Sequence, residues 1–366
     1  MKIMTIFGTR PEIIRLSLIL KILDQHCRHT TVHTGQNHEE SLSDIFIRDL
    51  QVRTPDVHLG IRANSFGEQL GMILTETDKV FDRVKPDRVL ILGDTNSALT
   101  AILAARRGIP VFHMEAGNRC YDDRVPEEVN RRIIDHSSSV LLPYTQRSKE
   151  NLVNEGIARE RIIVTGNPIQ EVLEHFSPEI ENSEALERFG VKPFEYFLVT
   201  LHRAENVDRP ERLKGILSGF QMVAEKFGKT ILVSLHPRTA DKLSRFGIKT
   251  ETEKIKLLDP LGFFDFVRLE KNAQAVLTDS GTVQEECAIF GIPNVTLRDV
   301  TERPETIECG SNILSGGDPE TIVRAVDLTV SQPVKWQAPQ EYLAENVSLT
   351  VSKILLGYHS QRKHFS

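Results

Sequence analysis

Charged residues that could do chemistry follow several short apolar runs of the chain. The segment 8–12, Gly-Thr-Arg-Pro-Glu, comes directly after one such run, and Asp94 comes shortly after another. Proline at position 11 is typical of a first helical turn, so Arg10 would lie at a helix N-terminus, where free N–H groups and the helix dipole favour an anion. Arg10 is therefore a candidate phosphate ligand or an ordinary salt-bridged arginine. Asp94 is a candidate catalytic carboxylate or a helix cap.

Two more carboxylates follow the apolar run 110–114. Glu115 stands at its end and is a candidate acid or base. The pair His113 and Glu115 is also typical of zinc deaminases, but their Pro-Cys-x-x-Cys partner is absent here, so we expect no metal site. Glu127 lies four residues before Arg131, a spacing that lets the arginine orient the carboxylate, although Pro-Glu-Glu also begins many ordinary helices.

The most specific signal of the second half follows the apolar run 275–278. Ser280, Gly281 and Thr282 come at once, and a helix begins there. The Ser280 hydroxyl and the N–H groups of the next two residues predict an anion cradle at a helix N-terminus. Glu286 lies one to two turns further along, where it could accept hydrogen bonds from a ribose diol.

Two histidines also follow apolar runs of the second half. They are His202 and His236, and either one alone is more often structural than catalytic. Arg303 lies in a densely charged segment after a further run. A Gly-Lys-Thr at 228–230 resembles the end of a phosphate-binding loop, but the required earlier glycine is missing, so it carries no prediction.

The elements that must position these residues are parallel strands alternating with helices. Strands are expected at 2–7, 88–92, 110–114, 140–142 and 162–164, and helices at 12–25, 65–83, 97–107, 126–136 and 145–155. After a Pro-interrupted stretch, strands are expected at 196–200, 230–235, 275–278 and 294–297, and helices at 209–226, 319–331 and 345–356. This alternation predicts two doubly wound α/β units, with ligands bound beyond the carboxyl ends of their strands, in the cleft that the units face.

The composition restricts the class of protein further. The chain has 366 residues, 45 Lys+Arg against 51 Asp+Glu, and a net charge of −6, which argues against a protein that grips nucleic acid through its phosphates. No apolar stretch approaches the about 18 residues of a membrane helix, and the first residues lack a signal-peptide pattern. The four cysteines are widely scattered, which is typical of free thiols in a reducing cytoplasm. We expect neither a membrane nor a nucleic-acid partner.

A series of motifs, in this order along the chain, identifies a family resemblance. They are Gly-Thr-Arg-Pro-Glu at 8–12, His-Thr-Gly-Gln at 33–36, Gly-Asp-Thr at 93–95, His-Met-Glu-Ala-Gly at 113–117, Pro-Glu-Glu-x-Asn-Arg at 126–131, Thr-Gly-Asn at 165–167, His-Arg at 202–203, Thr-Asp-Ser-Gly at 278–281 and Arg-Asp-x-Thr-Glu-Arg-Pro-Glu at 298–305. Over nearly its whole length the chain resembles the non-hydrolysing UDP-N-acetylglucosamine 2-epimerases.

The resemblance implies a fold and a reaction. The fold is glycosyltransferase-B-like, with Rossmann-like domains at 1–170 and 171–344 and a last helix at 345–366 packing back on the first. The reaction inverts carbon two of a UDP-linked 2-acetamido sugar: UDP leaves, a 2-acetamidoglycal stays bound, and UDP re-adds with the proton on the other face. The resemblance also implies a cytoplasmic bacterial homodimer that needs no metal, nicotinamide or other cofactor.

Roles of individual residues are carried over from the family position by position. The catalytic positions match Asp94, Glu115, Glu127, Arg131 and His202, and which carboxylate removes the proton stays open. The UDP contacts match Arg10, Ser280, Gly281 and Glu286, with the backbone near Phe266 at the uracil, and the expected binding set also includes Arg15, Asn118, His236, Thr282 and Arg303.

Two departures bear on the substrate. The family's common enzymes have lysine where this chain has Arg15, and Gly-Leu-Arg-Thr-Gly where it has Gly-Asn-Arg-Cys-Tyr at 117–121. The Asn-Arg-Cys form, together with Arg-Pro-Glu-Ile-Ile-Arg-Leu at 10–16, resembles a sub-branch that makes UDP-N-acetyl-L-fucosamine from UDP-2-acetamido-2,6-dideoxy-L-talose for bacterial surface polysaccharide. The family's allosteric segment matches only in part: Gln36 is kept, whereas Asn37 and Ala63-Asn64 differ.

Three alternatives remain open at this point. The substrate could be UDP-N-acetylglucosamine itself. The protein could instead be a glycosyltransferase of the same fold, which passes the sugar of UDP to an acceptor. A non-catalytic nucleotide-sugar sensor is the third, and the clustered acidic residues disfavour it.

Overall fold

The chain folds into two compact units in a computed structural model that describes all residues except 36–39, 64, 249, 251, 333–334 and 358–366. Unit 1 comprises Met1–His175 and Glu341–Ser366, and unit 2 comprises Phe176–Gln340. The boundary expected after residue 170 lies inside helix α7 (Ile169–His175) of unit 1. The allosteric positions Gln36, Asn37 and Asn64 fall outside the described residues.

Unit 1 is built on a parallel six-stranded sheet in the order β3-β2-β1-β4-β5-β6. The strands are β1 (Lys2–Phe7), β2 (Arg28–His33), β3 (Val57–His58), β4 (Arg88–Leu92), β5 (Val111–Met114) and β6 (Val140–Leu142). Every residue of β4 and β5 is buried, as expected of strands covered by helices on both faces. The chain order reverses between β1 and β4, which makes their carboxyl ends the switch point where α/β sheets bind ligands.

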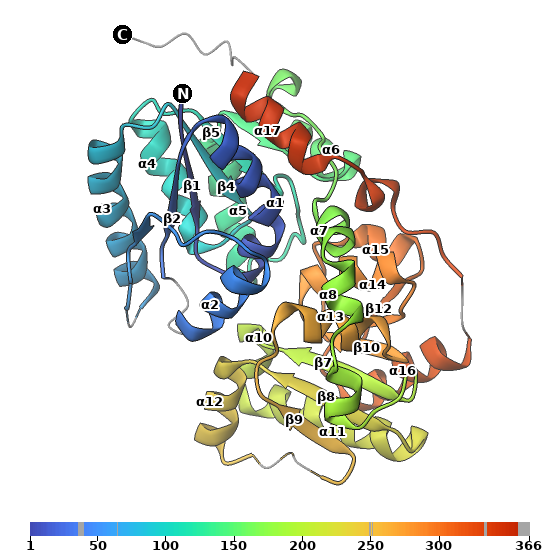
Figure 1. The fold of residues 1–366 in the computed structure, drawn as a ribbon. Coiled ribbons are helices and arrows are strands. Elements are labelled where there is room, and N and C mark those ends of the chain that lie inside the picture. The colour runs from blue at the N-terminus through green and yellow to red at the C-terminus, as the bar shows by residue number, and fades with distance from the viewer. Residues whose placement is uncertain (36–39, 64, 249, 251, 333–334, 358–366) are drawn as a thin grey trace. The chain divides into compact units, whose positions relative to one another are not determined.

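The helices of unit 1 come from both ends of the chain. They are α1 (Arg10–His26), α2 (Glu40–Asp49), α3 (Phe66–Val84), η1 (Asn96–Leu99), α4 (Thr100–Arg106), α5 (Pro126–Ser137), α6 (Gln146–Asn154), η2 (Arg159–Arg161), α7, η3 (Gln340–Leu343) and α17 (Val347–Gly357). In Figure 1, α17 in red lies beside α1 in blue, and the two helices pack together. The last helix thus belongs to unit 1 and begins at Val347 rather than at residue 345.

The strand expected at 162–164 is absent, and that prediction was wrong. Only an isolated parallel bridge joins Ile162 to Leu141. The Ile163 N–H does donate to the Leu141 carbonyl at 2.9 Å, but the return bond would need an N–H from residue 143. That residue is Pro143, which has no N–H, so the ladder cannot continue.

Unit 2 repeats the plan of unit 1 with a parallel sheet in the order β12-β11-β10-β7-β8-β9. The strands are β7 (Tyr196–Leu201), β8 (Thr230–Leu235), β9 (Ile255–Leu258), β10 (Ala275–Thr278), β11 (Asn294–Thr296) and β12 (Asn312–Leu314). The helices are α8 (Ser177–Glu181), α9 (Ala185–Phe189), α10 (Ala204–Val207), α11 (Pro210–Phe227), α12 (Pro237–Phe246), α13 (Phe263–Lys271), α14 (Gly281–Phe290), α15 (Pro304–Glu308) and α16 (Pro319–Ser331). Its switch point lies between β7 and β10.

Helix α11 illustrates how the sequence sets these elements. Pro210 is its first residue, and Gly228 ends it in the left-handed conformation at φ 66°. Leu213, Ile216 and Phe220 recur at helical spacing and are all buried in the core of unit 2. Within the described part of the chain, no helix is both long enough and apolar enough to cross a membrane.

Candidate active site

The switch point of unit 1 brings the loops after β1 and β4 side by side. Arg10 is the first residue of α1, and its guanidinium lies 5.7 Å from the centre of the Phe46 ring. A cation at a helix N-terminus opposes the helix dipole unless an anion accompanies it. A carboxyl group is already there: Glu12 Oε2 accepts hydrogen bonds from the Gly8 N–H at 3.0 Å and the Thr9 hydroxyl at 2.7 Å.

This arrangement corrects part of the prediction for the loop at 8–12. The N–H groups that precede α1 were expected to be available to a bound phosphate. The Gly8 N–H instead serves the carboxylate of Glu12, which is 1% exposed. The side chain of Arg10 therefore remains the candidate phosphate ligand of this loop. Thr9 and Glu12 have the spacing of a capping box, but the Thr9 hydroxyl donates to Glu12 and makes no capping bond to the helix.

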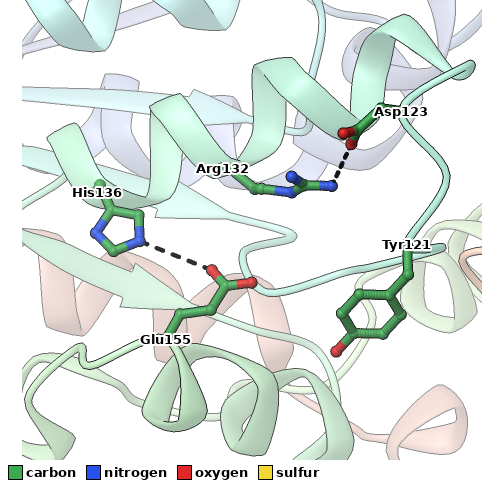
Figure 2. A pocket seen from close by; sticks show the side chains of 5 residues that line it. All are labelled: Tyr121, Asp123, Arg132, His136 and Glu155. Atoms are coloured by element: carbon green, nitrogen blue, oxygen red, sulfur yellow. Dashed lines mark hydrogen bonds and ion pairs between the residues drawn. The ribbon is translucent and has the colours of Figure 1, made fainter.

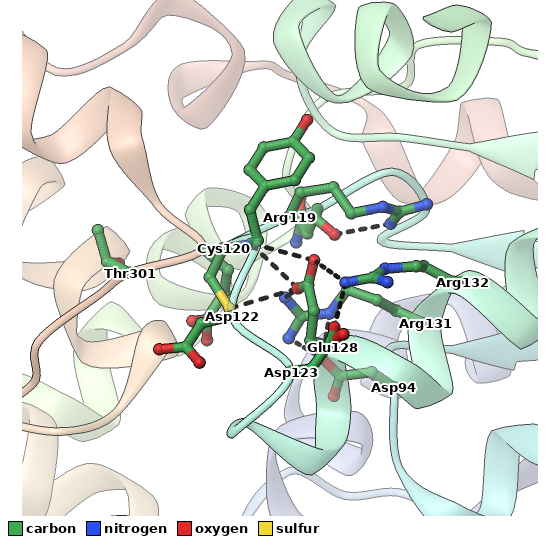
Figure 3. A network of polar contacts seen from close by, with 12 residues as sticks. Asp94, Arg119, Cys120, Asp122, Asp123, Glu128, Arg131, Arg132 and Thr301 are labelled. Carbon is green, nitrogen blue, oxygen red and sulfur yellow. Dashed lines mark hydrogen bonds and ion pairs between the residues drawn. The ribbon is translucent and has the colours of Figure 1, made fainter. Parts of the chain in front are cut away.

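Asp94 follows β4 and is held by a buried arginine of helix α5. Arg131 donates to Asp94 Oδ2 from Nε at 3.1 Å and from Nη2 at 2.6 Å, while its Nη1 donates to Glu128 Oε2 at 2.8 Å (Figure 3). The Arg131 side chain is 2% exposed and that of Asp94 24% exposed. A two-pronged contact of this kind fixes the carboxylate in one orientation while leaving it accessible.

Glu128 is a residue that the sequence reasoning left as an ordinary part of a helix start. Its carboxylate is buried and accepts hydrogen bonds from the N–H groups of Cys120 at 3.0 Å and Tyr121 at 3.1 Å (Figure 3). Burial alone would raise the pKa of Glu128, but the Cys120 N–H and the charge of Arg131 lower it below its usual value. Glu128 thus stays ionised and ties the loop at 117–121 to Arg131.

Glu115 follows β5 in a left-handed backbone conformation, with φ of 64°. A non-glycine residue held there stores strain, which natural proteins concentrate at functional sites. Arg15 Nη1 lies 3.6 Å from Glu115 Oε2, and the Asn118 side-chain amide donates to Oε1 at 3.3 Å. Two of the residues that depart from the family's common enzymes therefore contact the same carboxylate.

A buried ion network holds the loop that carries Asn118. Arg119 donates to both oxygens of Glu155, at 2.7 and 2.6 Å, and pairs with Asp135 at 2.8 Å. Asp135 also binds His113 Nδ1 at 2.9 Å. Burial raises the pKa of Asp135, but His113 and Arg119 lower it further than burial raises it. The network is structural, and it accounts for His113 without a metal.

Gly117 lets this loop lie against helix α6. Its φ is 81°, and a Cβ placed there would lie 2.2 Å from the Ser148 carbonyl oxygen. No other residue fits such a position. Ser148 also donates its hydroxyl to Asn118 Oδ1 at 2.9 Å, so the loop is fixed on both sides of Asn118.

The switch point of unit 2 carries a histidine oriented by a buried aspartate. His202 follows β7, and its Nδ1 lies 3.1 Å from Asp279 Oδ1, at the end of β10. Asp279 also accepts the N–H groups of His202 at 3.0 Å and Arg203 at 2.8 Å. Although burial raises the pKa of Asp279, the His202 ring and these N–H groups hold it well below its usual range. Because Asp279 stays ionised, it accepts a hydrogen bond from Nδ1 of His202. The Nε2 atom is therefore the nitrogen available for proton transfer.

The start of helix α14 is the place where the sequence predicts an anion cradle. Ser280 is its N-cap residue, and the Ser280 hydroxyl makes no capping bond to the helix. Gly281 is buried and Thr282 half-buried. A Cβ on Gly281 would lie 2.9 Å from Glu302 Oε1, so the buried Glu302 side chain would have to move for a larger residue to fit.

The remaining predicted residues have different surroundings. Arg303 is buried and pairs with Glu285, and Glu286 is buried on α14. The Phe266 N–H donates to the Gly262 carbonyl within α13. The His236 ring lies 5.4 Å from that of His202. Glu127 is half-buried in the first turn of α5.

An open pocket of about 560 Å³ is lined in part by residues of α5 (Figure 2). Tyr121, Asp123, Arg132, His136 and Glu155 line it. Its charged groups pair with one another: Arg132 with Asp123 at 2.6 Å, and His136 with Glu155 at 3.7 Å. None of the predicted site residues lines this pocket, so we place the candidate active site at the strand ends instead.

Comparisons with known proteins identify the family of the chain. The model of the UDP-N-acetylglucosamine 2-epimerase family matches residues 21–356. The UDP-N-acetylglucosamine 2-epimerase of Methanocaldococcus jannaschii is 43% identical, over 93% of this chain and 95% of that protein. The UDP-2,3-diacetamido-2,3-dideoxy-D-glucuronate 2-epimerase of Pseudomonas aeruginosa is 37% identical, over 92% of this chain and 94% of that protein.

A solved structure extends the agreement to the fold. The crystal structure of the M. jannaschii enzyme in complex with UDP-GlcNAc and UDP superposes with a TM-score of 0.93 at 41% identity, covering 97% of this chain and 99% of that chain. The two parallel six-stranded sheets match those of these epimerases, which are glycosyltransferase-B-like. The chain therefore belongs to the UDP-N-acetylglucosamine 2-epimerase family and is a UDP-sugar 2-epimerase, an isomerase that acts on carbohydrates.

Proposed function

We propose that the chain inverts carbon two of a UDP-2-acetamido sugar by eliminating UDP and adding it back. In the first half-reaction a base removes the carbon-two proton, the bond between carbon one and the diphosphate oxygen breaks, and a 2-acetamidoglycal forms. In the second half-reaction UDP attacks carbon one while an acid delivers a proton to the opposite face of carbon two. The two half-reactions remove and return one proton and one UDP, so the proposed steps need no oxidant, reductant or cofactor.

The observation that carries this proposal is the fixed orientation of acid/base groups at both switch points. Asp94 is held by Arg131, and Glu115 is contacted by Arg15 and Asn118. His202 is held by Asp279 in unit 2. Groups whose side chains are held in this way can transfer protons without a free-energy cost for orienting the side chain first. Glu127 is the third carboxylate of unit 1 in this set of acid/base groups.

The departing UDP gains negative charge, and that charge must be stabilised for the bond to break. Arg10 at the start of α1 and the Ser280–Gly281–Thr282 cradle at the start of α14 are the groups proposed to do so. Glu286 is proposed to accept hydrogen bonds from the ribose hydroxyls, and the start of α13, next to Phe266, to face the uracil. Since the same substrate needs both sets of groups, loss of either set should abolish turnover.

UDP-N-acetylglucosamine is the substrate that the relatives favour. The M. jannaschii relative carries that name and was crystallised with UDP-GlcNAc and UDP. UDP-2-acetamido-2,6-dideoxy-L-talose, giving UDP-N-acetyl-L-fucosamine, is the second candidate. Arg15 and Asn118 support it, because both depart from the family's common residues and both contact Glu115. The P. aeruginosa relative, whose name specifies a third sugar, supports divergence of substrates within the family.

Incubation with each UDP-sugar in heavy water tests the proposal. Solvent deuterium should enter carbon two without any acceptor, and the C2 epimer should accumulate to a constant ratio, both readable by proton NMR. A glycosyltransferase or a sensor would leave carbon two protonated. Absence of exchange with both sugars would refute the proposed function. The ratio of kcat/KM between the two sugars decides the substrate. A homodimer, a cytoplasmic location and a role in surface polysaccharide stay predictions.

A further inference from the structure

We propose that Glu12 is a positioning residue whose carboxyl group joins the Arg10 loop to the Asp94 loop and sets the separation between these two groups. The inference rests on the proposed function for its catalytic consequence. Its structural content, a bridge across the switch point of unit 1, stands on contacts within one unit. Glu12 contacts neither substrate nor reacting atoms in this account and acts only through the loops.

The two carboxylate oxygens of Glu12 serve different loops. Oε2 accepts from the Gly8 N–H at 3.0 Å and from the Thr9 hydroxyl at 2.7 Å, both in the loop after β1. Oε1 accepts from the Thr95 hydroxyl at 3.2 Å, in the loop after β4. Arg10 is the neighbour of Thr9, and Asp94 is the neighbour of Thr95. One buried side chain thus spans the two loops that carry a proposed phosphate ligand and a proposed proton-transfer group.

The rest of the Asp94 loop is held from other directions. Asn130 donates its amide to the Asp94 carbonyl at 3.0 Å and to Asn96 Oδ1 at 3.2 Å. These contacts join the loop to α5, and Arg131 adds the contact to the Asp94 carboxylate. The bond from the Thr95 hydroxyl to Glu12 ties this loop to the start of α1.

Unit 2 also has a buried carboxylate that links two loops at its switch point. Asp279 at the end of β10 binds the N–H groups of the loop after β7 and orients His202. In each unit, then, a buried carboxylate crosses the switch point between the two central strands. In unit 2 this carboxylate holds a reactive side chain directly. In unit 1 the structure assigns the equivalent task to Glu12, which holds the loops.

The consequence for catalysis follows from how steeply proton transfer depends on position. A misplacement of about 1 Å at a reacting group can cost about a hundredfold in rate. Freeing the Asp94 loop from α1 should displace Asp94 by a fraction of that distance, because Asn130 and Arg131 still hold it. We therefore expect a loss of about tenfold in kcat when the bridge is cut, with KM for the UDP-sugar changed by less than about threefold.

A matched pair of variants separates the bridge from an ordinary hydrogen bond. Thr95→Val removes the bond between the loops, and Thr9→Val removes a bond of the same kind within one loop. Both replace one hydroxyl by a methyl group. Glu12→Gln serves as the rescue variant, because its amide oxygen can accept from Gly8 and Thr9 while its NH₂ donates to the Thr95 hydroxyl.

The experiment measures kcat, KM and amide hydrogen exchange of the peptide covering residues 93–99. Thr95→Val should lower kcat about tenfold and speed exchange in that peptide, whereas Thr9→Val and Glu12→Gln should stay within about threefold of the wild type in kcat. Equal kcat losses in the two threonine variants, or a Glu12→Gln variant as slow as Thr95→Val, would overturn the inference.

Hydrogen exchange keeps this test distinct from the test of the proposed function. If the wild type failed to turn over either UDP-sugar, the proposed function would fall, yet faster exchange in Thr95→Val alone would still demonstrate the bridge. If the wild type were active and exchange in the 93–99 peptide were unchanged in Thr95→Val, the bridge would be wrong and the proposed function would stand.

Discussion

Replacing Asp279 by asparagine should stop His202 from acting in proton transfer, while the protein still folds. Asp279 accepts from His202 Nδ1, so the neutral ring carries its proton on Nδ1 and presents a bare Nε2. The asparagine amide can keep its oxygen on the Arg203 and Asn206 donors, now 2.8 and 3.1 Å from Oδ2. Its NH₂ then faces Nδ1 and donates to it, which drives the ring proton to Nε2.

The magnitude follows from these contacts. A histidine locked in the wrong tautomer by an Asp-to-Asn exchange loses about 10²- to 10⁴-fold in turnover. Stability should fall less, because the bonds from Arg203 and Asn206 survive as neutral rather than charge-assisted bonds. Taking about 1 kcal/mol for each weakened bond, we expect a loss of about 2 kcal/mol in the free energy of unfolding, or roughly 4–8 °C in melting temperature.

A double-mutant cycle with His202→Ala provides the assay. If Asp279 acts through the ring, Asp279→Asn should have almost no further effect on kcat in the His202→Ala background. The stability loss of Asp279→Asn should persist in that background, since the N–H donors remain. Independent, multiplicative losses of kcat in the double variant would refute the reasoning, because Asp279 would then act by a route that does not include His202.

Three further outcomes are expected. Glu127→Gln should lower kcat at least about a hundredfold with an unchanged melting temperature, and equal losses of activity and stability would favour a purely structural role. Arg131→Gln, which leaves Asp94 and Glu128 without their guanidinium partner, should lower the free energy of unfolding measured with urea by about 3–5 kcal/mol, and Arg131→Lys should restore part of this loss. Burial raises the pKa of Glu12 from 4.5 to about 7, so the native state binds more protons between these values. Stability should therefore fall by about 3 kcal/mol as pH rises through that window, and Glu12→Gln should lack this slope; parallel curves would contradict the assignment.

The strands that the sequence predicted well are those buried on both faces. Lys2–Phe7, Arg88–Leu92 and Ala275–Thr278 match their predicted bounds because continuous apolar runs are typical of central parallel strands. Arg28–His33 was not predicted, since it begins with polar side chains and is partly exposed at that end. Pairing to β1, which no local pattern records, makes it a strand.

The candidate site residues were predictable as types at strand ends, but their partners were not. That Arg131 orients Glu127, four residues away, stays a prediction. Its bonds to Glu128 and to Asp94, the latter 37 residues away in the chain, were not predicted. Glu12 and Thr95 are 83 residues apart. The order of strands in the sheet brings such pairs together. No local pattern in a single sequence shows that order, which is indicated only by resemblance to a family of known fold.

The most direct test of the central claim follows the oxygen that joins the sugar to UDP. A UDP-sugar labelled with ¹⁸O between carbon one and the diphosphate, incubated with the enzyme, should show the label moving into non-bridging positions of the β-phosphate, because free UDP can rotate before it re-adds. Inversion at carbon two with all of the label retained in the bridge would mean that this bond never breaks, and would contradict the account.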